Sequence, residues 1–516
     1  MNGAESLIRT LVDAGVDVCF ANPGTTEMHL VHALDAVGEA RAVLGLFEGV
    51  CTAGADGYAR MAGRPAMTLL HLGPGLANGL ANLHNAARAR TPVVNLVGEH
   101  ATWHRRRDAP LQTDIESFAR PVSKWVHTSA SAAEVAHDGA LAYAAATAAP
   151  SGVATLIVPA DCAWDDAEGP ARPIPGAPPA AVLDDAVQAA ASALAGSERP
   201  GALLLGATAL SELGIRAAGR IAAVTGCRIL SETFPARMER GGGLPAPERL
   251  PYFPEEATAV LAEASNLVLA GAREPVAFFG YPGLRSELAP EGLPIVTLAD
   301  PAHEAADALA RLADHLGAPQ HATPANGAPE PALPPDGPLT PQTVAQVVAA
   351  GQPEGAIVID EGLTLSAFYF AASRAAARHS YLALTGGAIG QGLPCAAGAA
   401  IACPDRPVIA FQADGSAMYT AQALWTHARE GLDITTLICS NRTYAILVEE
   451  LARAGITDPE PHTRAVTSLA DPALDWLSLS RGMGVPATRA TTTQELSTAL
   501  ANALAEPGPH LVEMVL

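Results

Sequence analysis

Short apolar runs alternate with amphipathic segments through the first 160 residues. The segment 4–14 has its apolar residues on one helical face and ends at Gly15. Five apolar runs of strand length follow, at 16–20, 41–47, 65–71, 91–98 and 153–159. Because apolar strands that alternate with helices are typical of parallel sheets covered on both faces, we expect this arrangement for the first unit.

The same alternation recurs twice further along the chain. The later apolar runs lie at 201–207, 227–232, 266–272 and 293–300, and then at 355–360, 381–384, 406–412, 434–440 and 509–516. Proline-rich stretches separate the units and have the composition of linkers. The sequence therefore predicts an α/β fold of three doubly wound parallel-sheet domains, at 1–166, 181–318 and 341–516, joined by linkers at 167–180 and 319–340.

Composition and charge narrow the class of protein. The 31 basic and 53 acidic residues give a net charge of −22, which argues against a nucleic-acid partner because duplex binding needs Lys and Arg at the phosphates. The long uncharged stretches 67–87, 139–160 and 379–404 are each broken by Gly, Pro or polar residues, so we expect no membrane span. Seven scattered cysteines without a CxxC pair favour free thiols in a reducing cytoplasm.

The third unit carries the strongest candidate chemistry. Asp414 and Asn441 each follow an apolar run, and the carboxyl ends of parallel strands meet at one edge of a sheet. Carboxylate and amide oxygens suit Mg²⁺, and Gly415 would let the backbone approach a phosphate. An Asp-Gly turn that only caps a helix is the alternative.

Ala413-Asp414-Gly415-Ser416, followed by Asn441, resembles the diphosphate–Mg²⁺ motif of thiamine diphosphate (ThDP) enzymes. The chain departs from the family pattern at Ala413 and Ser440, neither of which is expected to be a side-chain ligand. The resemblance implies ThDP and Mg²⁺ as cofactors. It assigns the metal ligands to Asp414, Asn441 and the main-chain oxygen of Thr443, and further cofactor contacts to Gly415, Ser416 and Tyr444.

Two further loops of the third unit match the same family. In TGGAIGQGLP (385–394), Ile389 takes the place of the apolar residue that wedges under the cofactor, and Gly387 and Gly390 allow close backbone approach. In EGLT (361–364), Glu361 and Thr364 take positions that meet the diphosphate. The helix expected after Tyr444 either lines the substrate pocket or is an ordinary amphipathic helix.

The first unit matches the family independently. Glu48 occupies the position of the glutamate that bonds N1′ of the aminopyrimidine, although a lone Glu after a strand is also a common helix cap. NPGTTE (22–27) resembles the corresponding loop of benzoylformate decarboxylases. That resemblance places Thr25 and His71 beside the reacting carbonyl; a buried structural histidine is the alternative for His71.

The resemblance spans nearly the whole chain, in the order PYR (aminopyrimidine-binding), central and PP (diphosphate-binding) domains, and is closest to the benzoylformate decarboxylase and acetolactate synthase branches. A second catalytic histidine is expected in the decarboxylase, but 271–283 holds Phe278, Phe279 and Tyr281 instead. The resemblance therefore implies 2-oxo acid decarboxylation with carboligation, as in acetolactate synthases. A benzoylformate decarboxylase-like or 2-hydroxyacyl-CoA lyase-like enzyme is the alternative.

The family also implies the assembly and the cofactor set. Its sites lie between subunits, so a homodimer or homotetramer is expected. FAD is not expected, because none of the expected strands is followed by a GxGxxG motif and a later acidic residue. A flavin- or nicotinamide-dependent oxidoreductase and a degenerate binding subunit are the rival classes; Glu48, Asp414 and Asn441 together speak against the binding subunit.

Overall fold

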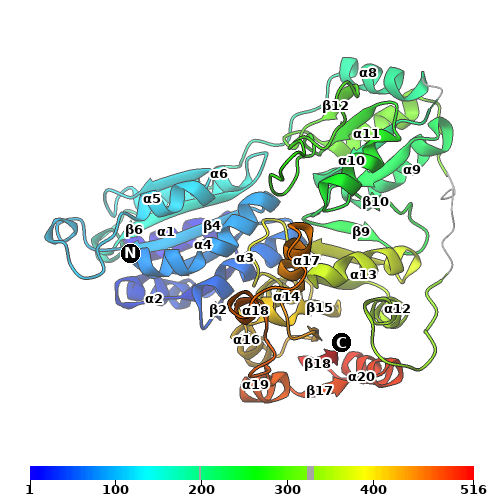
Figure 1. The fold of residues 1–516 in the computed structure, drawn as a ribbon. Coiled ribbons are helices and arrows are strands. Elements are labelled where there is room, and N and C mark those ends of the chain that lie inside the picture. The colour runs from blue at the N-terminus through cyan, green and yellow to red at the C-terminus, as the bar shows by residue number, and fades with distance from the viewer. Residues whose placement is uncertain (197–198, 322–329) are drawn as a thin grey trace.

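The computed structural model describes residues 1–196, 199–321 and 330–516. Three sheets of six, five and seven strands, with helices on their faces, form three units. Figure 1 shows the first unit in blue and cyan beside the third in yellow to red, with the central unit in green above the third. The predicted fold of three doubly wound sheets is confirmed.

The first sheet has the strand order β2-β1-β3-β4-β6-β5, with all neighbouring strands parallel. Its strands are β1 (Val18–Asn22), β2 (Arg41–Leu44), β3 (Ala66–Leu70), β4 (Val93–Glu99), β5 (Trp125–Thr128) and β6 (Val153–Pro159). Its helices are α1 (Gly3–Asp13), α2 (Met28–Val37), α3 (Glu48–Ala62), α4 (Leu72–Ala89), α5 (Ile115–Ala119), α6 (Val135–Thr147) and α7 (Ala160–Trp164), with 3₁₀ turns at Thr25–Glu27, Arg105–Arg107 and Arg120–Val122. The sequence missed β5, because this short edge strand is half exposed and has no continuous apolar run.

The central sheet has the order β10-β8-β7-β11-β12 and is also parallel. Its strands are β7 (Ala202–Leu205), β8 (Arg228–Ser231), β10 (Glu248–Arg249), β11 (Leu267–Ala270) and β12 (Ile295–Ala299). The helices α8 (Asp184–Ala195), α9 (Glu212–Thr225), α10 (Pro254–Ala262) and α11 (Ala305–His315) and a 3₁₀ turn at Ala207–Leu210 complete the unit.

The third sheet has the order β17-β18-β16-β15-β13-β14-β9. Its strands are β9 (Met238–Arg240), β13 (Ala356–Glu361), β14 (His379–Ala383), β15 (Val408–Ala413), β16 (Ile434–Ser440), β17 (Ala487–Ala490) and β18 (His510–Val515). Its helices are α12 (Pro341–Gly351), α13 (Ser366–Ala372), α14 (Gly392–Ala402), α15 (Asp414–Ala417), α16 (Ala423–Glu430), α17 (Ala445–Arg453), α18 (Pro461–Thr467), α19 (Trp476–Gly482) and α20 (Thr493–Ala505), with 3₁₀ turns at Leu363–Leu365 and Ser373–Ala375.

Two details of the third unit correct the sequence-based expectations. Strand β9 comes from the central part of the chain and pairs antiparallel with β14, so this sheet is not wholly parallel. A three-residue strand carries no periodicity that could predict it. The single helix expected after Ser416 is divided into α15 and α16, and between them Thr420 donates its hydroxyl to the carbonyl of Gly390, 2.8 Å away.

Helices α3 and α14 hold the first and third units together. A Cβ on Gly57 would lie 2.0 Å from the carbonyl oxygen of Cys395, and one on Gly398 would lie 1.9 Å from that of Gly54. Glycine is therefore required on both helices for this approach. Beside the contact, the buried Arg60 forms a bidentate ion pair with Asp56, at 2.9 and 2.7 Å.

The state of the cysteines and the character of the helices bear on two further expectations, free thiols and the lack of a membrane span. All seven cysteines are free thiols, and six are buried. Among the described helices, none combines the length and the apolar character that a bilayer crossing needs.

Candidate functional site

The proposed metal loop is assembled at the carboxyl ends of β15 and β16, which are paired in the sheet. Asp414 is buried; its Oδ1 accepts a hydrogen bond from the amide of Gly415 at 2.8 Å, and its Oδ2 accepts one from that of Arg442 at 2.7 Å. Oδ1 of Asn441 accepts from the amide of Thr443 at 3.0 Å. Burial raises the pKa of the Asp414 carboxyl. The structure thus brings the three predicted ligand residues into one loop cluster.

The surroundings of this loop fit a diphosphate and its metal ion. The space that a Cβ on Gly415 would fill is taken by the ring of Tyr444, 2.5 Å away. The hydroxyl of Ser416 is buried without a hydrogen-bond partner among the described residues. Because a buried hydroxyl is costly to leave unpaired, a ligand oxygen at this point would stabilise it. The oxygen donors of Asp414 and Asn441 suit Mg²⁺.

The glycine loop after β14 is held by a buried carboxylate. Glu361 accepts hydrogen bonds from the amides of Gly390 and Gly392, at 2.6 and 2.5 Å. Burial raises the pKa of Glu361 to about 7. Gly387 and Gly390 have φ of 74° and 96°, the left-handed region that favours glycine. Glu361 therefore holds the glycine loop that contains Ile389. Its contact with the diphosphate remains a prediction.

Thr364 and Ile389 are two further predicted residues of the third unit. Thr364 lies half-buried in the 3₁₀ turn after β13, and Ile389 lies half-buried between the two glycines. Their expected contacts with the cofactor remain predictions.

In the first unit, Glu48 is the first residue of α3 and is largely buried. Its Oε2 accepts a hydrogen bond from the side-chain amide of Asn78 at 2.9 Å. Asn82, one turn along α4, donates to the carbonyls of Gly49 at 2.9 Å and Gly390 at 3.3 Å. The two asparagines were missed from the sequence; their spacing on one face of a helix was the available signal.

His71 lies between β3 and α4 and is paired with a buried carboxylate. Its Nδ1 lies 2.7 Å from Oε2 of Glu27, whose side chain is fully buried. Glu27 also accepts from the amide of Gly24 at 2.7 Å and from the hydroxyl of Thr26 at 2.5 Å. A carboxylate only accepts, so Nδ1 carries a proton toward Glu27, and Nε2 takes no part in this pairing.

The loop before α2 holds Thr25 and Thr26 in different surroundings, and the expected role of Thr25 remains a prediction. Thr25 is exposed, whereas the hydroxyl of Thr26 lies 3.4 Å from Nδ1 of His71. Glu27 was not singled out from the sequence, although it ends the quoted NPGTTE motif. A Cβ on Gly98 would lie 1.6 Å from Oε1 of Glu27, so this carboxylate depends on a glycine of β4 that no local pattern indicates.

The residues of the candidate site come from two units of the chain, Glu48 and His71 from the first and Asp414 and Asn441 from the third. Among the described residues, no hydrogen bond joins Glu48 or His71 to Asp414 or Asn441. Among the contacts between the two units, Asn82 and Asn85 of α4 donate to the carbonyls of Gly390 and Ala388 in the glycine loop.

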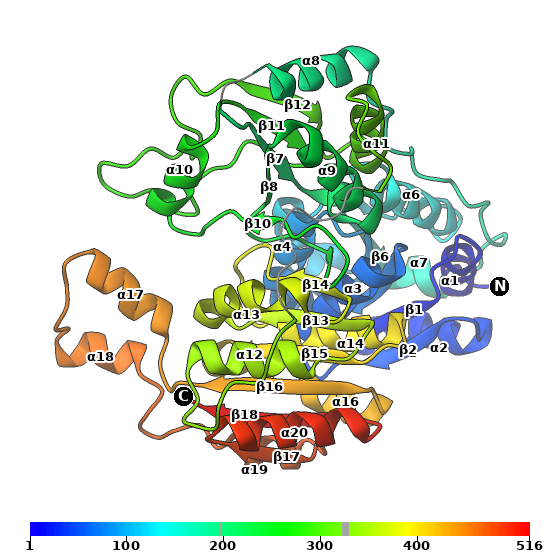
Figure 2. The same ribbon diagram turned by 90° about the vertical axis from the view of Figure 1, so that its right-hand side faces the viewer.

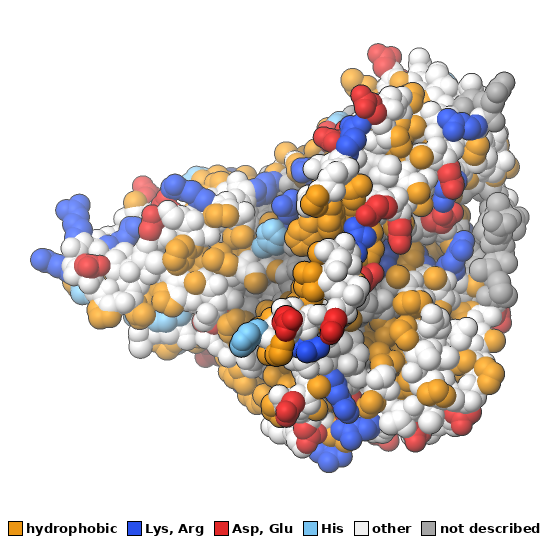
Figure 3. Space-filling view, viewed as in Figure 1, with side chains coloured by type: hydrophobic (Ala, Val, Ile, Leu, Met, Phe, Trp, Pro, Cys, Tyr) orange, Lys and Arg blue, Asp and Glu red, His pale blue; other side chains and the backbone are white. Residues whose placement is uncertain are grey.

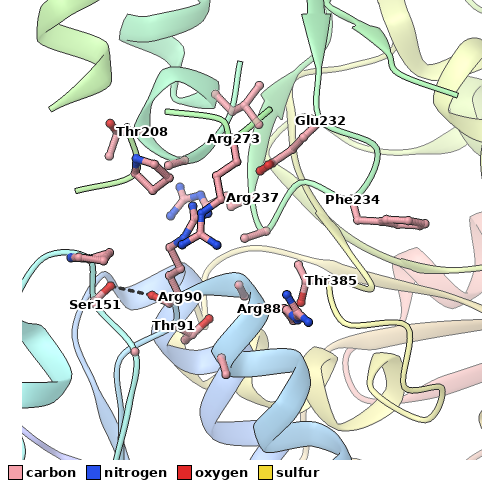
Figure 4. Close-up of a pocket in the computed structure, with 18 of the residues that line it drawn as sticks. Arg88, Arg90, Thr91, Ser151, Thr208, Glu232, Phe234, Arg237, Arg273 and Thr385 are labelled. Carbon is pink, nitrogen blue, oxygen red and sulfur yellow. Dashed lines mark hydrogen bonds between the residues drawn. The ribbon is translucent and has the colours of Figure 1, made fainter. Parts of the chain in front are cut away.

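A cavity of about 1250 Å³ separates the first and central units. It lies at the carboxyl ends of β7, β8 and β11, where open parallel sheets bind ligands. Figure 4 shows Arg90 from the end of α4 and Arg273 from the loop after β11 pointing toward one another across it, with Glu232 above. Burial raises the pKa of Glu232 to about 7. The expected absence of FAD remains a prediction.

Comparisons with known proteins agree with this geometry. Residues 1–118 match the N-terminal, and residues 364–514 the C-terminal, TPP binding domain of thiamine pyrophosphate enzymes. The chain is 53% identical to the Mycobacterium tuberculosis protein named "Putative acetolactate synthase large subunit IlvX", over 100% of this chain and 99% of that protein. It is 30% identical to benzoylformate decarboxylase of Pseudomonas aeruginosa, over 97% and 96%.

The fold also matches a solved structure over its whole length. ThDP-dependent 4-hydroxybenzoylformate decarboxylase of Rhodococcus jostii RHA1 superposes with a TM-score of 0.87 at 25% identity, covering 100% of this chain and 99% of that one. The two domain models match in the predicted order, and both a curated relative and a solved structure match over the whole chain. This chain belongs to the thiamine pyrophosphate enzyme family.

Proposed function

We propose that this protein is a ThDP- and Mg²⁺-dependent enzyme that decarboxylates a 2-oxo acid and joins the remaining fragment to a second carbonyl compound, as acetolactate synthases do. The observation that carries this proposal is the loop of the buried Asp414 and the half-buried Asn441, beside the buried Ser416 hydroxyl, which has no hydrogen-bond partner among the described residues. The relative named as an acetolactate synthase large subunit supports the finer assignment. The stretch 271–283, which holds no histidine, also supports it.

The residues of the third unit would hold the diphosphate end. Asp414, Asn441 and the main-chain oxygen of Thr443 would bind Mg²⁺, while Ser416 and the glycine loop would meet the phosphates. When bound, ThDP supplies a carbon nucleophile and an electron sink for the bond to the leaving carboxylate. The protein supplies orientation and proton control.

Glu48 and His71 would control the protons. Glu48 would hold a proton at N1′ of the aminopyrimidine, and Asn78 keeps its carboxyl group oriented. The Nε2 atom of His71 is available to hold or move a proton at a substrate oxygen, because Glu27 fixes Nδ1. Thr25 would contact substrate from the exposed end of the same loop.

A second candidate is non-oxidative decarboxylation that releases an aldehyde. The pair of His71 with Glu27 in the NPGTTE loop and the likeness to two decarboxylases favour it. A 2-hydroxyacyl-CoA lyase-like reaction is the remaining alternative. Turnover with ThDP and Mg²⁺ should be measured on pyruvate, benzoylformate, branched 2-oxo acids and acyl-CoA thioesters. Ligated products would support the first proposal, free aldehyde from benzoylformate the second, and no turnover on any 2-oxo acid would refute both.

We also propose a homodimer or homotetramer with sites between subunits. Glu48 lies in the first unit and Asp414 in the third, and no hydrogen bond joins them among the described residues, which supports this assembly. Mixed Glu48→Gln and Asp414→Ala subunits should then recover partial activity, because half of the heterodimer sites keep both residues. No recovery after verified subunit exchange would show that each chain builds its own site.

A further inference from the structure

Helix α17 starts at the metal loop, but none of its side chains is buried in the hydrophobic core. It begins directly after Tyr444, whose ring packs on Gly415, and it follows Asn441 by only a few residues. None of its nine residues is buried. Figure 2 shows α17 and α18 projecting from the third unit, below the loops of the central unit around α10. The direction of α17 must therefore be set by contacts at its surface.

Beside its neighbours α18 and the Leu363–Leu365 turn, α17 is contacted by side chains of the central unit. The hydroxyl of Tyr281 donates to Oε1 of Glu450 at 2.8 Å. Nη2 of Arg453 donates to both carboxylate oxygens of Glu255, at 2.9 and 3.1 Å. The Arg453 guanidinium also lies 4.3 Å from the ring centroid of Phe253 and 4.9 Å from that of Tyr281. We refer to Phe253, Glu255, Tyr281, Glu450 and Arg453 as the clasp.

The clasp adds aromatic and hydrogen-bond contacts to an exposed ion pair, since the side chains of Arg453 and Glu255 are 26% and 49% exposed. Glu450 and Arg453 are one turn apart, so both face the central unit from one side of α17. Arg453 combines a two-oxygen contact with two aromatic faces, and such contacts reinforce one another. Burial, followed by the neighbouring Glu450, raises the pKa of Tyr281 to about 12. The Tyr281 hydroxyl therefore stays protonated and can donate throughout the physiological range.

The same loop of the central unit also reaches the glycine loop of the site. A Cβ on Gly387 would lie 2.6 Å from the ring of Phe278, and Phe279 packs edge-on against Phe278 with ring centroids 4.9 Å apart. Phe279, Leu447 and Val448 are exposed, and Figure 3 shows apolar side chains gathered on this face of the molecule. The central unit thus touches both the glycine loop and the helix that continues the metal loop.

We propose that the clasp positions α17 and, through Tyr444, the loop of Asn441 and Thr443, so that Tyr281 and Arg453 are positioning residues for the 2-oxo acid site. The inference rests on the proposed function. A freed α17 would leave only a fraction of molecules in the competent arrangement, and apparent affinity falls by that fraction. Tyr281→Phe and Arg453→Gln should therefore raise KM and the Mg²⁺ concentration needed for half-maximal activity by about the same factor, roughly tenfold, with little change in kcat.

The first measurement needs no ligand. Hydrogen exchange of the 445–453 amides should be faster in Tyr281→Phe and Arg453→Gln than in the wild-type protein. Two matched controls keep wild-type exchange: Tyr252→Phe, which alters a neighbouring ring of the same aromatic group, and Arg285→Gln, which removes an exposed pair on the same loop. The effects of Tyr281→Phe and Glu450→Leu should be less than additive, because each change removes the same hydrogen bond; Glu450→Leu also removes the 3.7 Å contact with Nε of Arg453.

The outcomes separate the clasp from the proposed function. A wild-type protein without 2-oxo acid turnover would refute the proposed function and the positioning role together. Faster exchange in the variants would still show that the clasp residues hold α17. With an active wild-type protein, unchanged exchange would overturn the clasp. Faster exchange with unchanged KM and Mg²⁺ requirement would overturn the positioning role. Faster exchange with both constants raised by one factor is the expected result.

Discussion

Removal of Asp56 should test what holds the first and third units in register. Asp56 and Arg60 face each other on α3, with side chains 0% and 2% exposed. Asp56 accepts two hydrogen bonds from the guanidinium of Arg60 and one from the side-chain amide of Gln391 in the third unit. Arg60 also donates to the carbonyl of Ala383 at 2.9 Å and to the hydroxyl of Thr385 at 3.0 Å.

Asp56→Ala would leave a buried guanidinium without its counter-charge. Such a loss costs about 3–5 kcal/mol, and we expect about 3 kcal/mol of unfolding free energy because the acceptors at Ala383 and Thr385 remain. Replacement of both partners, as Asp56→Leu with Arg60→Met, should recover most of this loss, since apolar groups remove the uncompensated charge. The recovery stays incomplete because Gln391 loses its acceptor.

Urea unfolding followed by tryptophan fluorescence provides the assay. The matched control is Arg120→Ala, which breaks an exposed pair with Glu116 at the same i,i+4 spacing and should cost at most about 0.5 kcal/mol. A loss below about 1 kcal/mol for Asp56→Ala, at an unchanged dependence on urea, would refute the reasoning. It would mean that water or another group replaces the carboxylate.

Three further predictions concern the site and its charge state. Glu48→Gln should abolish turnover but retain ThDP, because it alters the aminopyrimidine contact and leaves the diphosphate end intact; wild-type exchange of the C2 proton of bound ThDP in this variant would contradict the assignment. Asp414→Ala should lose ThDP at limiting Mg²⁺, which equilibrium dialysis measures, and an unchanged dissociation constant would argue against the metal loop. Burial raises the pKa of Glu232 from 4.5 to about 7, so between these values the folded chain binds more protons than the unfolded chain. Through Glu232, the unfolding free energy therefore falls as pH rises through this window, by at most about 1.4 kcal/mol per pH unit. Glu232→Gln should make this fall less steep, which urea unfolding at several pH values would measure.

Local patterns were sufficient to predict much of the fold and the metal loop. A central strand of a parallel sheet is covered on both faces and therefore appears in the sequence as a continuous apolar run. For this reason the central strands of all three sheets were predicted. Asp414 and Asn441 follow successive strands, and these strands pair in the sheet, so their proximity follows from chain order. The predicted domain boundaries and cofactor contacts remain predictions.

The sequence by itself determined which residues could carry the chemistry, because side-chain type and position relative to a strand are local properties. The tertiary structure alone decided which groups support them. Glu27 pairs with His71 across 44 residues, Asn82 reaches Gly390 across 308, and Tyr281 reaches Glu450 across 169. A hydrogen-bond partner is selected by distance and direction after the chain has packed, and residues far apart along the chain carry no shared periodicity that could reveal the pairing.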